Sequence, residues 1–222
     1  MRLGDADPRS RLRLDALARL LQDMGNDDFA DAGHDPSSPW VARRMLVEAH
    51  GWPTLGQRLS LTTWCSALGG RWAERRTTVV ADGRPARLEV ASLWIFLADS
   101  GRPGRLPDWF GATWGDAALG RTVSARLTLP GPPAGAAGRE WALRATDLDV
   151  LGHVNNAATW QAVEDEVARH GLVPGRALLE YGDAIDPEDD VVLRSAIDDG
   201  ELRLWLCVGD EVRAAAVVTP SR

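Results

Sequence analysis

The N-terminal part of the chain carries apolar residues at the spacing of a helix. In segment 14–23 and one residue beyond it they recur every three or four positions, at Leu14, Leu17, Leu20, Leu21 and Met24. This period gives an α-helix one continuous apolar face. The segment also follows a turn rich in Asp, Pro and Ser, which favours a helix start there. The sequence therefore predicts an amphipathic helix over residues 14–23.

Beyond residue 39 the pattern changes to long extended segments. They cover residues 41–50, 57–67, 71–81 and 86–98, and turn sequences such as GWP, GG and ADGRP separate them. Such segments between Gly/Pro turns are typical of long antiparallel strands. Residues 99–138 are rich in Gly and Pro, with short helical pieces at LPDWF and TWGDAAL. The run PGPPAGAAG at their end has the composition of a linker.

The second half of the chain repeats this order. A short strand 140–146 and a helix 155–170 precede strands near 177–184, 191–197, 202–208 and 213–219. At a constant offset of 142 residues, Asp5 coincides with Asp147, Asp7 with Asp149, Gln22 with Glu164 and Cys65 with Cys207. Matches at one ungapped offset indicate a duplicated unit. We therefore divide the chain into an N-terminal unit 1–100, a linker 101–138 and a C-terminal unit 139–222.

Each unit is expected to form the same architecture. One helix followed by four or five long antiparallel strands favours a curved sheet that wraps a central helix. Two such units side by side would also protect their sheet edges. The predicted fold class is therefore α+β, with two antiparallel sheets that each wrap a long central helix.

Composition narrows the classes of function. None of the 25 basic residues among the 222 is Lys, which excludes Schiff-base chemistry, pyridoxal phosphate attachment and the P-loop lysine. The net charge of −7 argues against general nucleic-acid binding, because such binding depends on neutralising phosphates. Two cysteines without a CxxC pair favour a reducing cytoplasm. No segment approaches the roughly 20 apolar residues of a membrane span. We expect a cytoplasmic protein with no membrane span.

The most informative motif is DLDVLGHVNN at residues 147–156, which leads into the second helix. It places Asp149 and His153 four residues apart, with Gly152 between them, on a turn that ends at a helix start. Such a turn directs backbone N–H groups and the positive end of the helix dipole at one point, which suits the oxyanion of acyl transfer. Asn155 or Asn156 can cap the helix. Asp149 and His153 then supply a carboxylate and a titrating group.

In this motif the sequence resembles the acyl-ACP thioesterases, and more widely the hotdog-fold thioesterases, whose signature is roughly D-x-D-x-x-G-H-V-N-N-x-x-Y. The segment RLRLDALARLLQD is similar to the first helix of that family. LTTWCSALGGRWAERRTTVVADG is similar to its TW…R-R strand pair, and ASLWIFLADSGRPGRLP to the strand before its linker. The resemblance implies a tandem double hotdog fold and a role in fatty acid biosynthesis. It also implies hydrolysis of fatty acyl thioesters of acyl carrier protein (ACP) or coenzyme A to free fatty acid, with no cofactor.

The resemblance also assigns roles to residues. The catalytic Asp of the family falls on Asp149, as general base, and its catalytic His on His153, as the acid or orienting group. The other candidates are Asn155 and a reserve carboxylate, Glu164, because some hotdog enzymes carry their base on the central helix. Substrate contacts are expected from Gly152, Val154, Asn156 and Trp160.

The chain departs from the plant members of the family at several positions. Leu151 stands where those enzymes have Asn, and Ala184 and Ile185 stand where they have a Glu–Cys pair. These departures keep a second interpretation open, in which the protein is a catalytically degenerate acyl-thioester-binding or scaffold protein. A hotdog dehydratase is less favoured, because the first unit has no His near its helix start. A metal site at Asp149 and His153 is disfavoured too, because no third ligand lies at a suitable spacing.

The charges are distributed unevenly between the two units. Residues 1–110 hold 15 Arg and 14 acidic residues, whereas residues 111–222 hold 10 Arg and 18 acidic residues. An acidic ACP should therefore dock on the first unit, and Arg75 and Arg76 are candidate contacts. The sequence leaves the oligomeric state open, including a homodimer.

Overall fold

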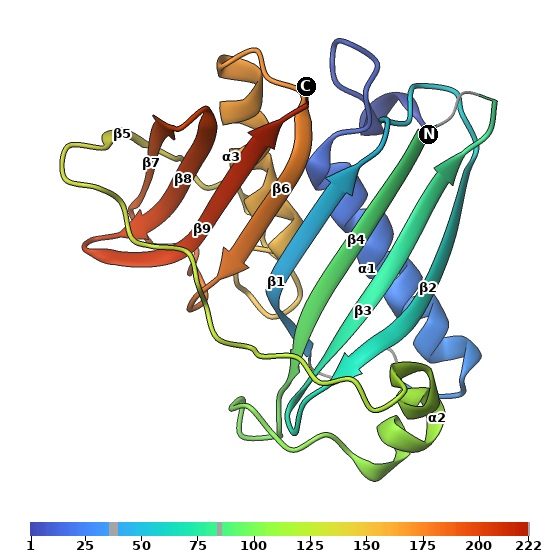
Figure 1. Ribbon diagram of the computed structural model, residues 1–222. Coiled ribbons are helices and arrows are strands. Elements are labelled where there is room, and N and C mark those ends of the chain that lie inside the picture. The colour runs from blue at the N-terminus through green and yellow to red at the C-terminus, as the bar shows by residue number, and fades with distance from the viewer. Residues whose placement is uncertain (36–39, 84–85, 222) are drawn as a thin grey trace.

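All nine strands in the described part of the chain belong to one antiparallel sheet (Figure 1). The computed structural model describes residues 1–35, 40–83 and 86–221. The strand order is β2-β3-β4-β1-β6-β9-β8-β7-β5. The strands are β1 (Trp40–Ala49), β2 (Leu59–Leu68), β3 (Trp72–Ala81), β4 (Ala86–Phe96), β5 (Ala137–Glu140), β6 (Pro174–Tyr181), β7 (Val191–Asp198), β8 (Glu201–Val208) and β9 (Glu211–Pro220).

The expectation of two separate sheets is wrong. The first strands after the helix of each half, β1 and β6, pair antiparallel, with Met45 opposite Leu179. Both side chains are buried, so the junction lies inside the core. Pairing of β1 with β6 satisfies backbone N–H and C=O groups that would otherwise form two exposed sheet edges. The two halves therefore share one continuous sheet.

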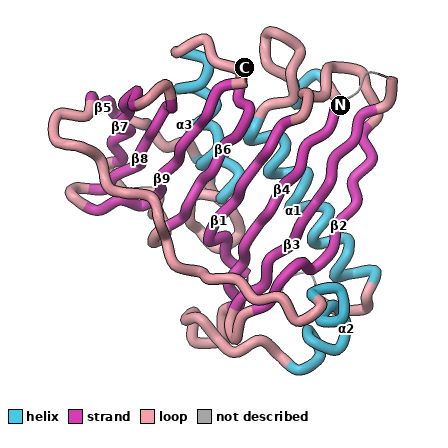
Figure 2. The backbone as a smooth tube through the Cα atoms, in the orientation of Figure 1, coloured by secondary structure: helices cyan, strands magenta, loops and turns pink. Residues whose placement is uncertain are grey.

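Two helices, α1 (Leu14–Asp31) and α3 (Asn156–Arg169), pack against each other and cover the same face of this sheet (Figure 2). Their apolar stripes meet the sheet in one cluster, in which Leu17, Val163 and Trp160 are fully buried. The first helix starts where its sequence pattern predicts, but it continues to Asp31 instead of ending at residue 23. The extra turns bring Phe29 into contact with aromatic rings of a further helix, α2 (Asp108–Ala118).

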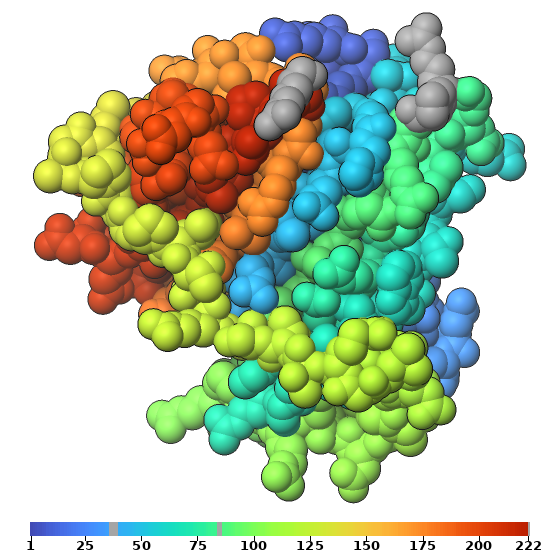
Figure 3. All heavy atoms as spheres, in the orientation of Figure 1, coloured from blue at the N-terminus to red at the C-terminus, as the bar shows by residue number. Residues whose placement is uncertain are grey.

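The segment between α2 and β5 is extended and crosses the opposite face of the sheet (Figures 1 and 3). The buried carboxylate of Glu180 accepts hydrogen bonds from the Thr128 and Leu129 N–H groups, at 2.7 and 2.8 Å. The indole of Trp205 donates to the Pro130 carbonyl at 2.7 Å, and that of Trp72 to the Val123 carbonyl at 2.8 Å. The segment thus binds to strands of both halves.

The internal repeat extends to backbone details. Two short 3₁₀ turns, η1 (Leu3–Asp5) and η2 (Ala145–Asp147), occupy equivalent positions at the offset of 142 residues. The isolated bridges Ala6–Leu12 and Leu148–Val154 are equivalent in the same way. The turn η2 overlaps the end of the strand that we expected over residues 140–146. The strand in this region is β5, which ends at Glu140. No helix in the described ranges is both long enough and apolar enough to cross a membrane.

Candidate active site

The DLDVLGHVNN motif forms a tight turn between η2 and α3. The Asp149 N–H donates to the His153 carbonyl and the Gly152 N–H donates to the Asp149 carbonyl, both at 3.0 Å. Gly152 has a φ of 81°, a left-handed conformation that a residue with a side chain rarely adopts. One oxygen of the Asp149 carboxylate accepts the Leu151 N–H at 2.9 Å. The turn thereby fixes Asp149 and His153 relative to each other.

Asn155 connects this turn to the start of α3. Its side-chain oxygen accepts the Ala157 N–H at 2.8 Å, which is the geometry of a helix N-cap. Its side-chain N–H₂ group donates to the other oxygen of Asp149 at 3.4 Å. The next residue, Asn156, is held through its carbonyl, which accepts the Tyr181 hydroxyl at 3.1 Å. Burial raises the pKa of Tyr181, so this hydroxyl stays protonated and donates.

His153 lies at the exposed rim of the turn and faces an acidic residue from another loop. Its Nε2 is 3.4 Å from Oδ1 of Asp186, and both side chains are about half exposed, at 47% and 61%. The two loops are tied together because the Val154 N–H donates to the Ile185 carbonyl at 2.9 Å. Asp186 is not among the site residues predicted from the sequence. The signal was its position directly after Ala184 and Ile185, the pair aligned with the Glu–Cys pair of the plant enzymes.

A cavity of about 580 Å³ opens beside the turn. Asp149 and Asn155 line it from the second half, and Gln22 and Asn26 line it from α1 in the first half. The other walls are largely apolar and come from α1, the sheet and α2, including Leu21, Phe29, Trp40, Cys65, Trp94 and Phe110. The polar groups of the motif therefore face a mainly apolar cavity.

The aromatic rings form a cluster at the α2 side of the cavity. Phe29 stacks on Trp114 with 4.7 Å between ring centroids, and Trp40 lies 5.1 Å from Phe110. Cys65 contributes a buried thiol to the same wall. Burial raises the pKa of this thiol, which keeps it protonated and a poor nucleophile.

The structure brings together only some of the residues that the sequence singles out. Among the described residues, Asp149 and Asn155 line the cavity, whereas Gly152, Val154 and Asn156 belong to the same turn and helix start without lining it. His153 stands at the rim. Asp149, Asn155 and His153 therefore form the candidate site.

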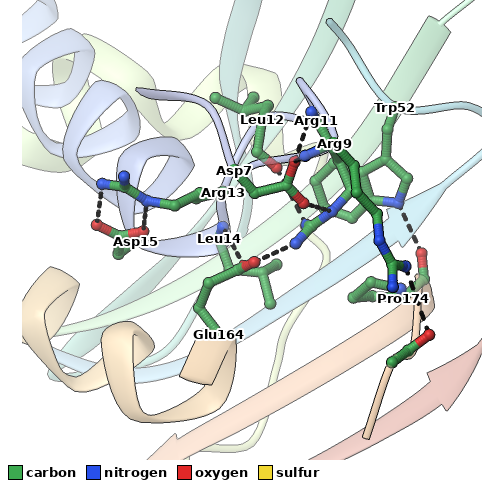
Figure 4. Close-up of polar contacts among 11 residues, drawn as sticks. Asp7, Arg9, Arg11, Leu12, Arg13, Leu14, Asp15, Trp52, Glu164 and Pro174 are labelled. Carbon is green, nitrogen blue, oxygen red and sulfur yellow. Dashed lines mark hydrogen bonds and ion pairs between the residues drawn. The ribbon is translucent and has the colours of Figure 1, made fainter. Parts of the chain in front are cut away.

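Two predicted site residues lie elsewhere. Trp160, a residue of α3, is fully buried in the main core and is not among the described residues that line the cavity. Glu164 is buried between the helices, where it forms an ion pair with Arg11 and accepts the Leu14 N–H at 3.0 Å (Figure 4). A carboxylate held by a guanidinium and a helix N–H is a structural group. Within the described ranges, no three His, Cys, Asp or Glu side chains converge as metal ligands would.

Arg75 is not a surface residue. Its side chain is 13% exposed and forms an ion pair with Asp28 of α1 at 2.6 Å. It also lines the cavity, so it is unsuitable as a docking contact for ACP. Arg76 is half exposed and lies 3.5 Å from Glu74.

Comparison with known proteins identifies the family. A model of the acyl-ACP thioesterase N-terminal domain matches residues 1–110. The chain belongs to the acyl-ACP thioesterase family. This membership makes it a thioester hydrolase by family. An uncharacterized protein of Mycobacterium tuberculosis (strain ATCC 25618 / H37Rv) is 31% identical over 218 residues, which are 96% of this chain and 87% of the relative.

Solved acyl-ACP thioesterases share the fold. The 12:0-ACP thioesterase from Umbellularia californica aligns with a TM-score of 0.82 and 19% identity, over 100% of this chain and 95% of that chain. An acyl-ACP thioesterase from Bacteroides thetaiotaomicron aligns with a TM-score of 0.80 and 17% identity, over 99% and 94%. The family member described here therefore has the hotdog-like thioesterase fold over its whole length.

Proposed function

We propose that this acyl-ACP thioesterase family member hydrolyses fatty acyl thioesters of ACP, and also of coenzyme A, to free fatty acids. The observation that carries the proposal is the cavity itself. It combines the Asp149 carboxylate and the Asn155 amide with walls that are largely apolar. An apolar pocket with a few converging polar groups is the usual form of a site for a lipid-like substrate.

In the proposed mechanism Asp149 acts as the general base. It takes a proton from water, and the resulting hydroxide adds to the thioester carbonyl carbon. The tetrahedral intermediate then collapses with cleavage of the C–S bond, and His153 gives a proton to the departing thiolate. Asp149 passes its proton back through solvent to His153, so both groups return to their starting states. Asp186 assists by orienting the imidazole, because its carboxylate lies 3.4 Å from His153 Nε2.

The start of α3 supplies the oxyanion site. The first N–H groups of a helix have no partner within the helix and carry the positive end of its dipole. Asn155 uses one of them, the Ala157 N–H. The Asn156 N–H follows directly after Asn155, which lines the cavity, and it has no hydrogen-bond partner among the described residues. A developing negative charge on the substrate oxygen is stabilised at this point.

A non-catalytic acyl-binding role is the second candidate. It is favoured by Leu151, an apolar residue that lines the cavity and is 54% exposed beside Asp149. Such a residue can hold a substrate but cannot orient water. Ala184 and Ile185 likewise offer no catalytic group.

Thiol release separates the two roles. The purified protein is incubated with acyl-ACP and acyl-CoA series of increasing chain length, and free thiol is measured over time. We expect turnover with at least one series. Tight binding of acyl-ACP without turnover at any chain length would instead establish the acyl-binding role.

A further inference from the structure

The two halves of the chain build the same turn but use it differently. In the second half the Asp149 N–H donates to the His153 carbonyl, and in the first half the Asp7 N–H donates to the Arg11 carbonyl at 2.8 Å. Helix α1 begins at Leu14 and helix α3 at Asn156, which are equivalent positions. The first half therefore contains a copy of the candidate active site, with Arg11 in the position of His153.

In the first half, a side chain from α3 occupies the space at the equivalent turn. Glu164, from the middle of α3, places one carboxylate oxygen against the Arg11 guanidinium and the other 3.0 Å from the Leu14 N–H (Figure 4). Leu14 is the counterpart of Asn156, so this N–H is equivalent to the one that we assign to the oxyanion. A negatively charged oxygen thus occupies, in the first half, the place that the substrate oxygen would take in the second.

The residue of α1 that corresponds to Glu164 is Gln22. Glu164 contacts the start of α1, and α1 and α3 pack together, so the repeat places Gln22 on the side of α1 that is equivalent to the Glu164 side of α3. Gln22 lines the cavity with Asp149 and Asn155. Its side-chain amide makes no hydrogen bond to any described residue. Where Glu164 fills the space in one half, the other half has an open cavity and an amide with no hydrogen-bond partner among the described residues.

We propose that Gln22 is a further catalytic residue of this enzyme, whose side-chain N–H₂ group donates to the thioester carbonyl oxygen opposite the Asn156 N–H. The inference rests on the proposed hydrolase function. A neutral amide suits this place because it can donate to an oxygen that gains negative charge, whereas a carboxylate would repel that oxygen. Two donors on opposite sides, one from each half, would hold the carbonyl in position beside Asp149.

The test compares Gln22→Ala and Gln22→Glu with Gln161→Ala. Gln161 is a half-buried glutamine on α3 whose amide oxygen accepts a hydrogen bond from Arg144, outside the described cavity lining. Loss of one oxyanion donor typically lowers kcat by about 10²- to 10³-fold. We expect this loss of kcat in Gln22→Ala with KM changed less than about threefold, and a larger loss in Gln22→Glu. Gln161→Ala should keep the kcat of the unchanged protein.

Binding of the fatty acid product gives a readout that does not depend on turnover. Titration calorimetry with dodecanoate should show about tenfold weaker binding to Gln22→Ala, because its carboxylate loses a donor, and still weaker binding to Gln22→Glu. If both Gln22 variants keep kcat and dodecanoate affinity within about twofold while Asp149→Asn is inactive, the role of Gln22 is wrong and the proposed function stands. If the unchanged protein hydrolyses no thioester, the proposed function fails and the role of Gln22 fails with it.

Discussion

The side-chain amide of Asn155 joins the N-terminus of α3 to the carboxylate of Asp149, because its oxygen caps the helix and its nitrogen lies 3.4 Å from Asp149 Oδ2. One side chain thus fixes both the helix that presents the backbone donors and the proposed base. Its two functions can be separated, since Ser is also a good N-cap but has no amide to reach Asp149.

Asn155→Ser should lower kcat with little change in stability. We expect about a tenfold lower kcat, because Asp149 loses an orienting hydrogen bond, and a free energy of unfolding within about 0.5 kcal/mol of the unchanged protein. Asn155→Ala loses the cap as well, so it should unfold about 1 kcal/mol more easily. Thiol release and urea unfolding measure the two effects. Equal stability losses in both variants would contradict the capping role.

Removal of the proposed base or acid should nearly abolish activity. Asp149→Asn or His153→Ala should each reduce kcat by about 10²- to 10⁴-fold, the usual effect of a positioned acid or base. Folding should be intact, because both residues lie on a turn outside the core. Asp7→Asn is the matched control, since Asp7 holds the equivalent position in the first half and bonds Arg11. Full activity in Asp149→Asn would show that the base lies elsewhere.

The Asp186 carboxylate should support His153 without being essential. Asp186→Asn keeps the shape of the side chain and removes the carboxylate charge that faces His153 Nε2. Because both groups are about half exposed, we expect kcat to fall only about threefold to tenfold. Asp183→Asn, in the same loop, should have no effect on kcat. The charge interaction also predicts that high salt narrows the difference between Asp186→Asn and the unchanged protein.

Gly25 offers a way to change the preferred chain length. It lines the cavity from the middle of α1, and a methyl group added there would meet no atom within 4 Å. Gly25→Ala should therefore stabilise the helix by about 0.5–1 kcal/mol and leave substrate preference unchanged. Gly25→Phe should occupy part of the cavity and reduce kcat/KM about tenfold for the longest substrates only. An equal loss at every chain length would mean that acyl chains do not occupy this part of the cavity.

Asp15 should make stability depend on pH. Burial alone would raise the pKa of Asp15, but hydrogen bonds from Arg13 and Arg19 outweigh burial and lower it. A carboxyl group with a lowered pKa in the folded state contributes stability above its unfolded pKa of about 3.9, and this contribution is lost as the pH falls further. At pH 7 Asp15→Asn should therefore lose about 1–3 kcal/mol of unfolding free energy.

The stability difference between Asp15→Asn and the unchanged protein should be smaller in acid than at pH 7. The gap between Asp15→Asn and the unchanged protein should shrink as the pH falls from about 5 to about 2, because the unchanged protein then loses the contribution of Asp15. Denaturant unfolding at a series of pH values measures this gap. The exposed Asp23 on the same helix provides the control, and Asp23→Asn should differ little from the unchanged protein at any pH. A gap for Asp15→Asn that stays constant with pH would contradict the assignment.

The sequence predicted the local elements better than the arrangement of the sheet. The helix start near Leu14 follows from the apolar period and the preceding turn, and the start near Asn156 follows from its capping residue Asn155. Such signals act within a few positions along the chain. The pairing of β1 with β6 joins strands more than a hundred residues apart. No local sequence pattern in either strand indicates which strand it pairs with. The two short helical pieces predicted after residue 105 form one helix, α2, because residues 108–118 continue without a break.

For the candidate site too, the sequence predicts contacts between neighbours in the chain but not contacts between distant segments. Asp149, His153 and Asn155 are neighbours in the chain, so their meeting at one turn could be predicted from their spacing. Asp186 and Gln22 come from a distant loop and from the other half, and only the folded chain places them near this turn. Glu164 looked like a free carboxylate because the sequence gives no sign that Arg11 will lie against it.

The pairing of Gln22 with one turn and Glu164 with the other has a consequence for the ancestry of the fold. In a symmetric homodimer of single units, both copies of the helix carry the same residue, so both turns would face an amide or both would face a carboxylate. Covalent fusion of the two units removes this constraint. The sequence of each helix can then change independently. One turn can keep an open cavity, while the other is filled by an ion pair that joins the two halves.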